Sequence, residues 1–333
     1  MRGRGWWSAR LRDAGCSEPW LRCVMSAILG AVRPHTPRGC PLSREFPDAE
    51  DLMYEDLMNR TPSSAPYVLG TTDAEHERLQ RQAGCLAPFT ERLFRDAGIT
   101  AGERVLDVGS GVGDVALLAA RLVGPTGEVV GMDRDGVALA KARMRAAAAG
   151  LNNIRFVEAD IATSLSGAQF DAVVGRLILQ FFPDPVAALR SLVVAVRPGG
   201  VVVFQESNWA SFLAQSAHLP LRSLCGSLIF DAFRRSGART DMDLALFRGF
   251  QEVGLPPPEL RLETPIGWDL ETRRWVDDLF RSVHPRFEEL GISGASVGDL
   301  STLAERLEAE LDATQSYAAC IGLVGAWSRK PIP

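Results

Sequence analysis

The sequence predicts a doubly wound α/β fold, and three observations lead to it. Short runs rich in Val, Ile and Leu alternate with helical patterns between residues 104 and 206. These runs are almost continuously apolar, as strands of a parallel sheet covered on both faces are. The chain has 333 residues, 46% of them apolar and 23% charged, which is an ordinary globular composition with enough apolar residues for a sizeable core.

The first two thirds of the chain supply five of the strands. A leading helical pattern over 73–96, as one or two helices, has Asp73 as a candidate N-cap and Gly98 as its stop. After it, we expect strands over 104–108, 127–132, 154–158, 170–175 and 200–206. Helices are expected between them over 115–123, 136–149 and 185–196.

The regular alternation of strand and helix patterns ends after residue 206. Two longer stretches, 207–238 and 270–316, look helical and are interpreted as insertions. Between and after them we expect a helix over 242–253, an extended run over 259–266 and a final strand over 319–327. The sheet would then have seven mostly parallel strands, with the last strand antiparallel.

The N-terminal residues do not share this pattern. We expect residues 1–57 to be a disordered extension and residues 58–333 to form one domain, with a helical cap over 67–98 and the two insertions as lids. Two other interpretations stay open for the extension: a targeting segment, because Arg residues precede an apolar stretch over 20–32, or an upstream reading of a gene whose working start is Met53 or Met58.

Composition also restricts the partners and the compartment. The net charge is −5, but residues 45–333 carry 28 basic against 39 acidic residues, which argues against a nucleic-acid partner. The apolar stretch over 20–32 is too short for a membrane span. Six Cys without a Cys-x-x-Cys pair, and without His at zinc-ligand spacing, indicate neither disulfides nor a metal site and favour a cytoplasmic location.

The sharpest local feature is a glycine loop between a strand and a helix. Residues 105–114 read Val-Leu-Asp-Val-Gly-Ser-Gly-Val-Gly-Asp. Glycines there allow positive φ and let a ligand approach the backbone, although a tight turn without any ligand would have the same composition. A dinucleotide fingerprint requires its third glycine at position 114, where Asp114 stands, and this loop has it at Gly113 instead, which disfavours a pyrophosphate ligand.

The glycine loop resembles the first motif of the class I S-adenosylmethionine-dependent methyltransferases, acid-x-Gly-x-Gly-x-Gly. Four further segments match that family in order: 129–133, ending in Asp133; 157–161; 170–176; and 196–200. The strand end at 175–178 reads Gly-Arg-Leu-Ile and lacks the Asn/Asp-Pro-Pro-Tyr/Phe signature of enzymes acting on nucleic-acid bases or glutamine amides. The chain therefore resembles the small-molecule branch, of the ubiquinone, menaquinone and secondary-metabolite type, which implies a Rossmann-like sheet.

The resemblance implies S-adenosylmethionine as the cofactor and assigns residues to it. Asp133 would accept hydrogen bonds from the ribose hydroxyls, with Arg134 beside it, and Asp160 and Ile161 would contact the adenine. Asp107 would support the loop or the methionine amine, or be structural only. The cap would add Tyr67 facing the sulfonium and Arg78 and Gln82 near the carboxylate. The full set is Tyr67, Arg78, Gln82, Asp107, Gly109, Ser110, Gly111, Gly113, Asp133, Arg134, Asp160, Ile161 and Arg176.

Methyl transfer requires an aligned approach and exclusion of water, and a general base only where the acceptor must lose a proton. Candidates at the strand ends are Glu206, which we favour as the base, and Arg176; His218 in the first insertion is a third. Each also has a structural interpretation, as a cap or a core residue. The insertions supply aromatic residues for a lid over an apolar molecule, or for ordinary core packing.

The sequence thus predicts a methyltransferase, monomeric or homodimeric, for a small, hydrophobic metabolite. Two alternatives stay open: a nicotinamide-dependent oxidoreductase, which the glycine spacing disfavours, and a cofactor-binding regulatory protein without turnover. The sequence does not name the acceptor or the atom that is methylated.

Overall fold

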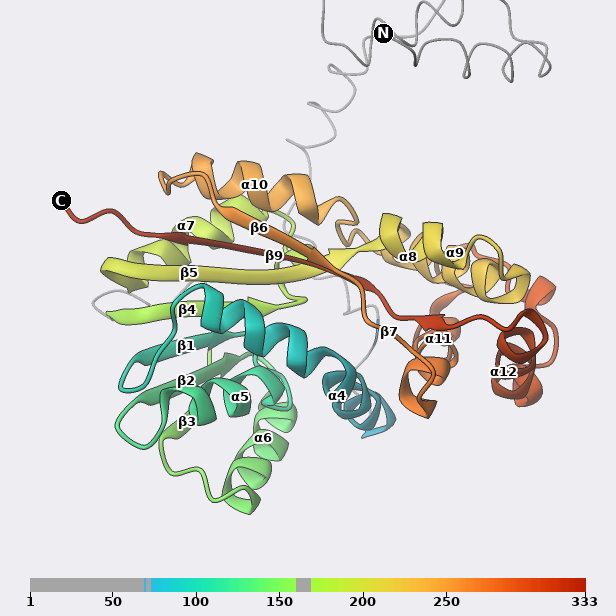
Figure 1. Ribbon diagram of the computed structural model, residues 1–333, viewed down its shortest axis with the longest axis horizontal. Helices are drawn as coiled ribbons and strands as arrows, with labels where there is room; N and C mark the ends of the chain where they lie inside the picture. Colours follow the sequence, from blue (N-terminus) through green and yellow to red (C-terminus); the bar gives the residue numbers. More distant parts are fainter. Residues whose placement is uncertain (1–68, 70–72, 160–168) are drawn as a thin grey trace, which may run out of the picture. The chain divides into compact units, whose positions relative to one another are not determined.

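A seven-stranded sheet forms the centre of the computed structural model, which describes residues 69, 73–159 and 169–333. The strand order is β3-β2-β1-β4-β5-β9-β6 (Figure 1). Its strands are β1 (Arg104–Val108), β2 (Glu128–Asp133), β3 (Ile154–Glu158), β4 (Phe170–Arg176), β5 (Val196–Asn208), β6 (Glu259–Glu263) and β9 (Gly322–Arg329). The first five are parallel, and β9 runs antiparallel to both β5 and β6. The predicted doubly wound, mostly parallel sheet with an antiparallel last strand is therefore confirmed.

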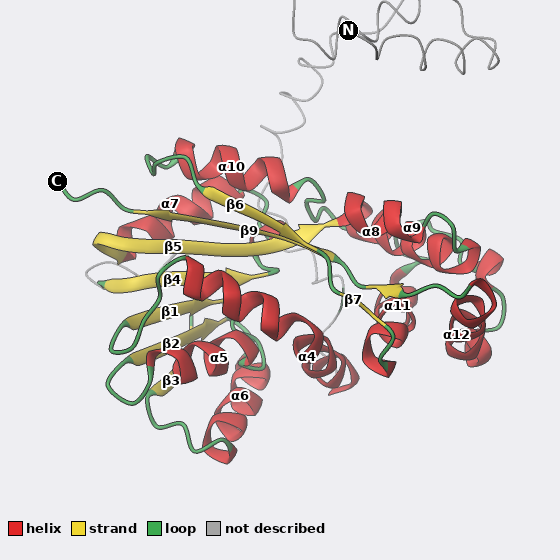
Figure 2. Cartoon of the chain, in the orientation of Figure 1, coloured by secondary structure: helices red, strands yellow, loops and turns green. Residues whose placement is uncertain are grey.

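Helices cover both faces of this sheet (Figure 2). One face carries α4 (Asp73–Asp96), α5 (Asp114–Val123) and α6 (Gly136–Ala148), and the other carries α7 (Pro185–Ala195) and α10 (Met242–Glu252). Successive residues of β1 point to opposite faces of the sheet. Val105 therefore packs against α4, α5 and α6 on one face, and Leu106 and Val108 belong to the core that α7 and α10 cover on the other. All three side chains are buried, which explains why the strands are apolar without alternation.

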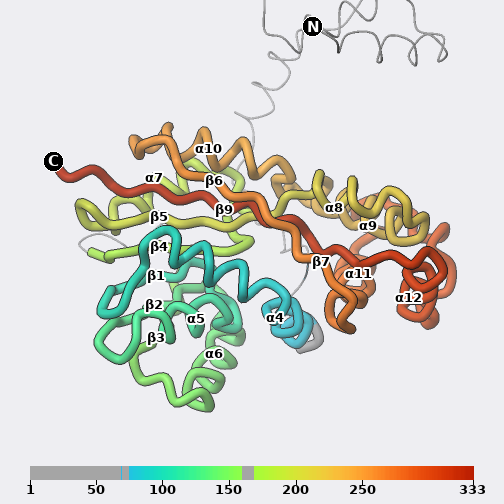
Figure 3. The backbone as a smooth tube through the Cα atoms, in the orientation of Figure 1, coloured from blue at the N-terminus to red at the C-terminus, as the bar shows by residue number. Residues whose placement is uncertain are grey.

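The two predicted insertions pack together beyond the carboxyl end of β5 (Figure 1). The first contains α8 (Trp209–Ser216) and α9 (Pro220–Arg235), and the second contains α11 (Leu270–Val283), α12 (Leu303–Thr314) and three short 3-10 turns, His284–Arg286, Ala295–Val297 and Leu300–Thr302. Phe212 and Trp275 join the two segments through an edge contact, with ring centroids 5.3 Å apart. In Figure 3 these yellow and red segments, distant in sequence, lie side by side.

The cap is a single helix, α4, with Pro88 inside it. Gly325 of β9 allows this helix to pack closely on the sheet, because a Cβ there would lie 2.7 Å from Leu93 Cδ1. Further along, Arg81 of α4 forms an ion pair with Asp278 of α11 at 3.0 Å. The cap thus contacts both the sheet and the inserted helices.

The strand boundaries in the last third differ from the prediction. The run expected over 259–266 is divided into β6 and β7 (Ile266–Gly267), and β7 pairs with β8 (Ala318–Ala319) in a second, two-stranded sheet. Pro265 lies at the division, where it has no N–H for a ladder, although its carbonyl accepts the N–H of Cys320. β5 is also longer than expected and includes Ser207 and Asn208.

The expected extension over 1–57 lies outside the described residues. Within the described ranges, no helix combines the length and the apolar character that crossing a membrane requires.

Candidate functional site

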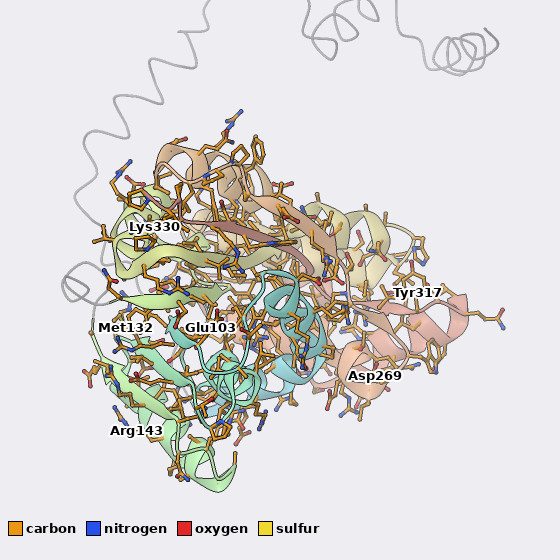
Figure 4. All side chains as sticks on the ribbon, turned by 60° about the vertical axis from the view of Figure 1, so that its left-hand side comes forward. Glu103, Met132, Arg143, Asp269, Tyr317 and Lys330 are labelled. Atoms are coloured by element: carbon orange, nitrogen blue, oxygen red, sulfur yellow. The ribbon has the colours of Figure 1, made fainter. Side chains whose placement is uncertain are left out.

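A cavity of about 710 Å³ lies at the carboxyl ends of β1, β2 and β4, where ligands of open α/β sheets collect. What we call its glycine end is formed by the glycine loop and the residues that close β2, among them Met132, labelled in Figure 4. What we call its aromatic end is formed by Phe181, Trp209, Phe233 and Trp275, which belong to one cluster of packed side chains. Helix α4 contributes His76, Arg78, Leu79 and Gln82 to the lining.

The three glycines of the loop all have positive φ, but for different reasons. Gly109 (φ +68°) lies under Ile178, and a Cβ there would lie 2.5 Å from that side chain. Gly113 (φ +89°) is the N-cap of α5 and packs against Ala142 of α6, away from the cavity lining. Gly111 (φ +49°) lines the cavity and faces open space, so this backbone is accessible to a ligand.

Asp133 organises the glycine end. Its Oδ2 accepts the N–H of Gly111 at 2.8 Å, and its Oδ1 accepts the N–H of Asp135 at 2.9 Å. Each carboxylate oxygen has further acceptor capacity. Asp133 and the adjacent Arg134 both line the cavity, as does Ser110, whose hydroxyl oxygen is buried without a hydrogen-bond partner among the described residues.

Asp107 lies beneath the loop and does not line the cavity. Burial raises the pKa of this carboxyl well above its usual range; the charge of Arg176 opposes that shift, and the charges of Asp133 and Asp114 add to it. Neither carboxyl oxygen has a hydrogen-bond partner among the described residues, so its three possible roles all stay predictions.

Arg176 lines the cavity between its two ends and donates from Nη1 to Thr90 Oγ1 at 3.1 Å. Burial lowers the pKa of its guanidinium, whereas Asp114 and Asp107 raise it. Arg176 is thus a positive charge held among carboxylates at the edge of the glycine end.

Arg78 and Gln82 lie together on the cavity wall. Arg78 donates from Nε and Nη2 to Glu75 at 2.8 and 2.6 Å, and from Nη1 to Gln82 Oε1 at 2.6 Å. These three bonds use one hydrogen of each guanidinium nitrogen, which leaves one hydrogen on Nη1 and one on Nη2 for a further acceptor. Ser282 of α11 donates to the same Glu75 at 2.6 Å and fixes it further.

Glu206, the expected base, contacts backbone groups in the structure, and its role as a base stays a prediction. Its side chain is fully buried and does not line the cavity. It accepts the backbone N–H groups of Ile178, Leu179 and Gln180 at 3.1, 2.8 and 3.4 Å. Burial raises the pKa of Glu206 to about 7, against the opposing effect of these three donors.

His218 is also remote from the cavity. It is exposed at the end of α8, and its Nε2 lies 2.7 Å from Ser316 Oγ, so it joins the first insertion to the residues after α12. The structure therefore gives His218 a local contact outside the cavity lining, and its catalytic role stays a prediction.

Three of the predicted cofactor residues, Tyr67, Asp160 and Ile161, lie outside the described residues. Of the other candidates, the structure brings Arg78, Gln82, Gly109, Ser110, Gly111, Asp133, Arg134 and Arg176 to one cavity.

Several cavity residues were not identified from the sequence. His76 is buried, with Nε2 3.9 Å from Asp135 Oδ2 and Nδ1 without a partner in the described part of the chain. A signal existed, because His76 precedes Leu79, Ala83 and Leu86 on the apolar face of the helix. Gln180 and Ser207 also line the cavity, and no local pattern distinguished them.

Comparison with known proteins adds three likenesses. Residues 99–228 match a family model described as a methyltransferase domain. A demethylmenaquinone methyltransferase of Staphylococcus aureus is 32% identical over 121 residues, which are 36% of this chain and 49% of that protein, so the chain spans about half the length of the curated relatives it matches. Among solved structures, YcgJ from Bacillus subtilis (TM-score 0.47, 16% identity, 73% and 98% of the two chains) and the [4+2]-cyclase SpnF (TM-score 0.47, 20% identity, 74% and 82%) are similar.

The residues present fit S-adenosylmethionine. Open space above Gly111, the acceptor capacity of Asp133 and the unpartnered hydroxyl of Ser110 lie together at the glycine end. On the cap side, the remaining Nη hydrogens of Arg78 and the Nε2 hydrogens of Gln82, whose Oε1 accepts from Arg78, suit a carboxylate.

Proposed function

We propose that this chain is a class I S-adenosylmethionine-dependent methyltransferase that methylates a small, apolar metabolite; the match of residues 99–228 to a family model described as a methyltransferase domain supports this. S-adenosylmethionine supplies an electrophilic methyl group on a positively charged sulfur. The single observation that carries the proposal is the continuity of the cavity: the residues of the glycine end and those of the aromatic end line one and the same cavity.

The chain's own residues would bind, orient and enclose. Asp133 would hold the ribose hydroxyls, while Arg78 and Gln82 of α4 would bind the carboxylate from above. Since α4 forms part of the wall, a bound cofactor would be covered by the cap, which excludes water from the reacting atoms.

The aromatic end supports an apolar acceptor. Trp209 and Phe233 lie with ring centroids 5.2 Å apart, and Phe181 and Phe233 lie 6.0 Å apart. A pocket of this kind takes apolar ligands and orients them with a few polar groups. The relative named a demethylmenaquinone methyltransferase supports a small-molecule acceptor in the same sense.

The test is thermal unfolding of the full chain with S-adenosylhomocysteine, with NADH, or with neither. A ligand that binds only the folded state adds about 2.7 kcal/mol at 100 times its Kd, which raises Tm by roughly 5 °C. We expect this rise with S-adenosylhomocysteine alone and its loss in Asp133→Asn. The control Asp299→Asn changes an exposed cap at a distant 3-10 turn and should respond as the wild type does.

Other outcomes separate the alternatives. A rise with NADH alone would contradict the proposal and favour an oxidoreductase. Binding of S-adenosylhomocysteine without methyl transfer to any of a broad panel of apolar acceptors would favour a cofactor-binding regulatory protein.

A further inference from the structure

We propose that Gln180 orients the methyl acceptor by donating a hydrogen bond from its side-chain Nε2, and that the acceptor is a neutral, ring-containing molecule with a hydroxyl or carbonyl oxygen. The proposal rests on the proposed function and specifies the substrate class for the same cavity.

The segment that carries Gln180 is held rigidly after β4. Glu206 accepts three consecutive N–H groups of this segment, from Ile178 to Gln180, and the N–H of Arg239 donates to the carbonyl of Gln180 at 2.8 Å. Leu177, immediately before it, has φ +54°, a left-handed conformation that is unfavourable for a non-glycine residue. Strain that the surrounding bonds maintain is characteristic of segments that position functional groups.

The side chain of Gln180 is held as well. It is only 2% exposed and lines the cavity, and its Oε1 accepts the hydroxyl hydrogen of Ser207 at 2.6 Å. With Oε1 accepting from Ser207, Nε2 is the end of the amide that has hydrogens to donate into the cavity. Among the described residues, no acceptor takes a hydrogen from Nε2, which leaves this donor for a ligand in the cavity.

The surroundings of this donor determine the ligand class. Phe181 follows Gln180 in the chain, and Trp209 and Phe233 complete an aromatic wall at the same end of the cavity. Such a wall favours a ligand with an apolar ring. A ligand that has no oxygen would leave the Nε2 donor of Gln180 without a hydrogen-bond partner. Sites with a buried polar group discriminate strongly against analogues that lack the matching group.

The test compares two ligands of similar size, 1-naphthol and 1-methylnaphthalene, which differ in a hydroxyl against a methyl group. Their Kd values are measured by isothermal titration calorimetry on the full chain saturated with S-adenosylhomocysteine. We expect the wild type to bind 1-naphthol about tenfold more tightly than 1-methylnaphthalene, as one hydrogen bond provides. In Gln180→Leu this ratio should fall to about one, with the Kd of 1-methylnaphthalene unchanged.

Two further variants make the result specific. Ser207→Ala keeps the amide but releases its orientation, so the ratio should fall between those of the wild type and Gln180→Leu; this variant also decides the question if Gln180→Leu does not fold. Gln251→Leu removes an exposed glutamine from α10 and should leave the ratio at its wild-type value.

The possible failures are distinguishable. If S-adenosylhomocysteine does not bind the wild type, the proposed function itself fails. If it binds, but the two naphthalenes bind equally or neither binds, or the ratio survives in both Gln180→Leu and Ser207→Ala, then the role of Gln180 is overturned while the proposed function stands.

Discussion

At the scale of single residues, two neighbouring side chains at the end of β5 differ in what they contact. Glu206 points to the backbone of the segment after β4, whereas Ser207 lines the cavity and orients Gln180. Successive residues of a strand point to opposite faces, so a shift of one position exchanges a structural residue and a site residue. The sequence places both at the correct end of the strand but does not indicate which one faces the ligand.

The buried Glu206 gives the folded protein a pH dependence. Because the pKa of Glu206 is raised to about 7 from an ordinary 4.5, the folded chain keeps a proton that the unfolded chain loses between these values. The free energy of unfolding should therefore fall as the pH rises, by up to about 3 kcal/mol through this group, and level off above about pH 7. Urea unfolding of the wild type and Glu206→Gln at pH 5, 6, 7 and 8 measures the difference.

The Gln variant has no proton to lose at this position, so the difference in unfolding free energy between wild type and variant should change between pH 5 and about pH 7 and then level off. Glu288→Gln, at an exposed position, is the matched control and should follow the wild-type curve. A gap that is constant from pH 5 to pH 8 would contradict the assignment.

At the scale of elements, two glycines at the cap helix α4 should respond in opposite ways to an added methyl group. Gly84 is exposed in the middle of the helix, where a Cβ would meet only the flexible end of Glu271, at 3.2 Å. Gly325 of β9 lies under Leu93, whose buried side chain cannot move aside. Gly84→Ala should therefore stabilise the fold by about 0.5–1 kcal/mol, because alanine favours a helix. Gly325→Ala should destabilise it by about 1–3 kcal/mol through overpacking.

Chemical denaturation of both variants at one pH checks the pair, and each serves as the control for the other. If both substitutions shift the midpoint in the same direction, the packing of α4 on β9 described here is wrong.

At the scale of the whole molecule, cofactor binding should affect one face of the sheet more than the other. Residues of α4 line the cavity, whereas α10 packs on the opposite face against β5 and β9. We expect S-adenosylhomocysteine to slow hydrogen exchange of the α4 amides by tenfold or more and to leave the slowest α10 amides changed only as far as global stability requires.

The measurement is hydrogen exchange followed by mass spectrometry, with and without ligand, and with Asp133→Asn as the control that should show no slowing. Equal slowing in α4 and α10 would mean that the cap does not enclose the ligand locally.

The sequence by itself determined the doubly wound sheet, the glycine loop and the place of Asp133. These features depend on local periodicity and on short spacings, such as the apolar run 104–108 and the glycines at 109, 111 and 113, which physical rules connect directly to strands, turns and strand ends. Even here, Pro265 divided an expected strand, because a missing N–H ends a ladder whatever the hydropathy indicates.

Only the tertiary structure decided what surrounds the ligand. Glu206 and His218 do not line the cavity, whereas His76, Gln180, Trp209 and Trp275, from four separate helical segments, do. Contacts such as Ser207 with Gln180, or Glu75 with Ser282, depend on which face of each element meets which neighbour. That choice is made by packing between distant parts of the chain, so no local pattern in the sequence contains it.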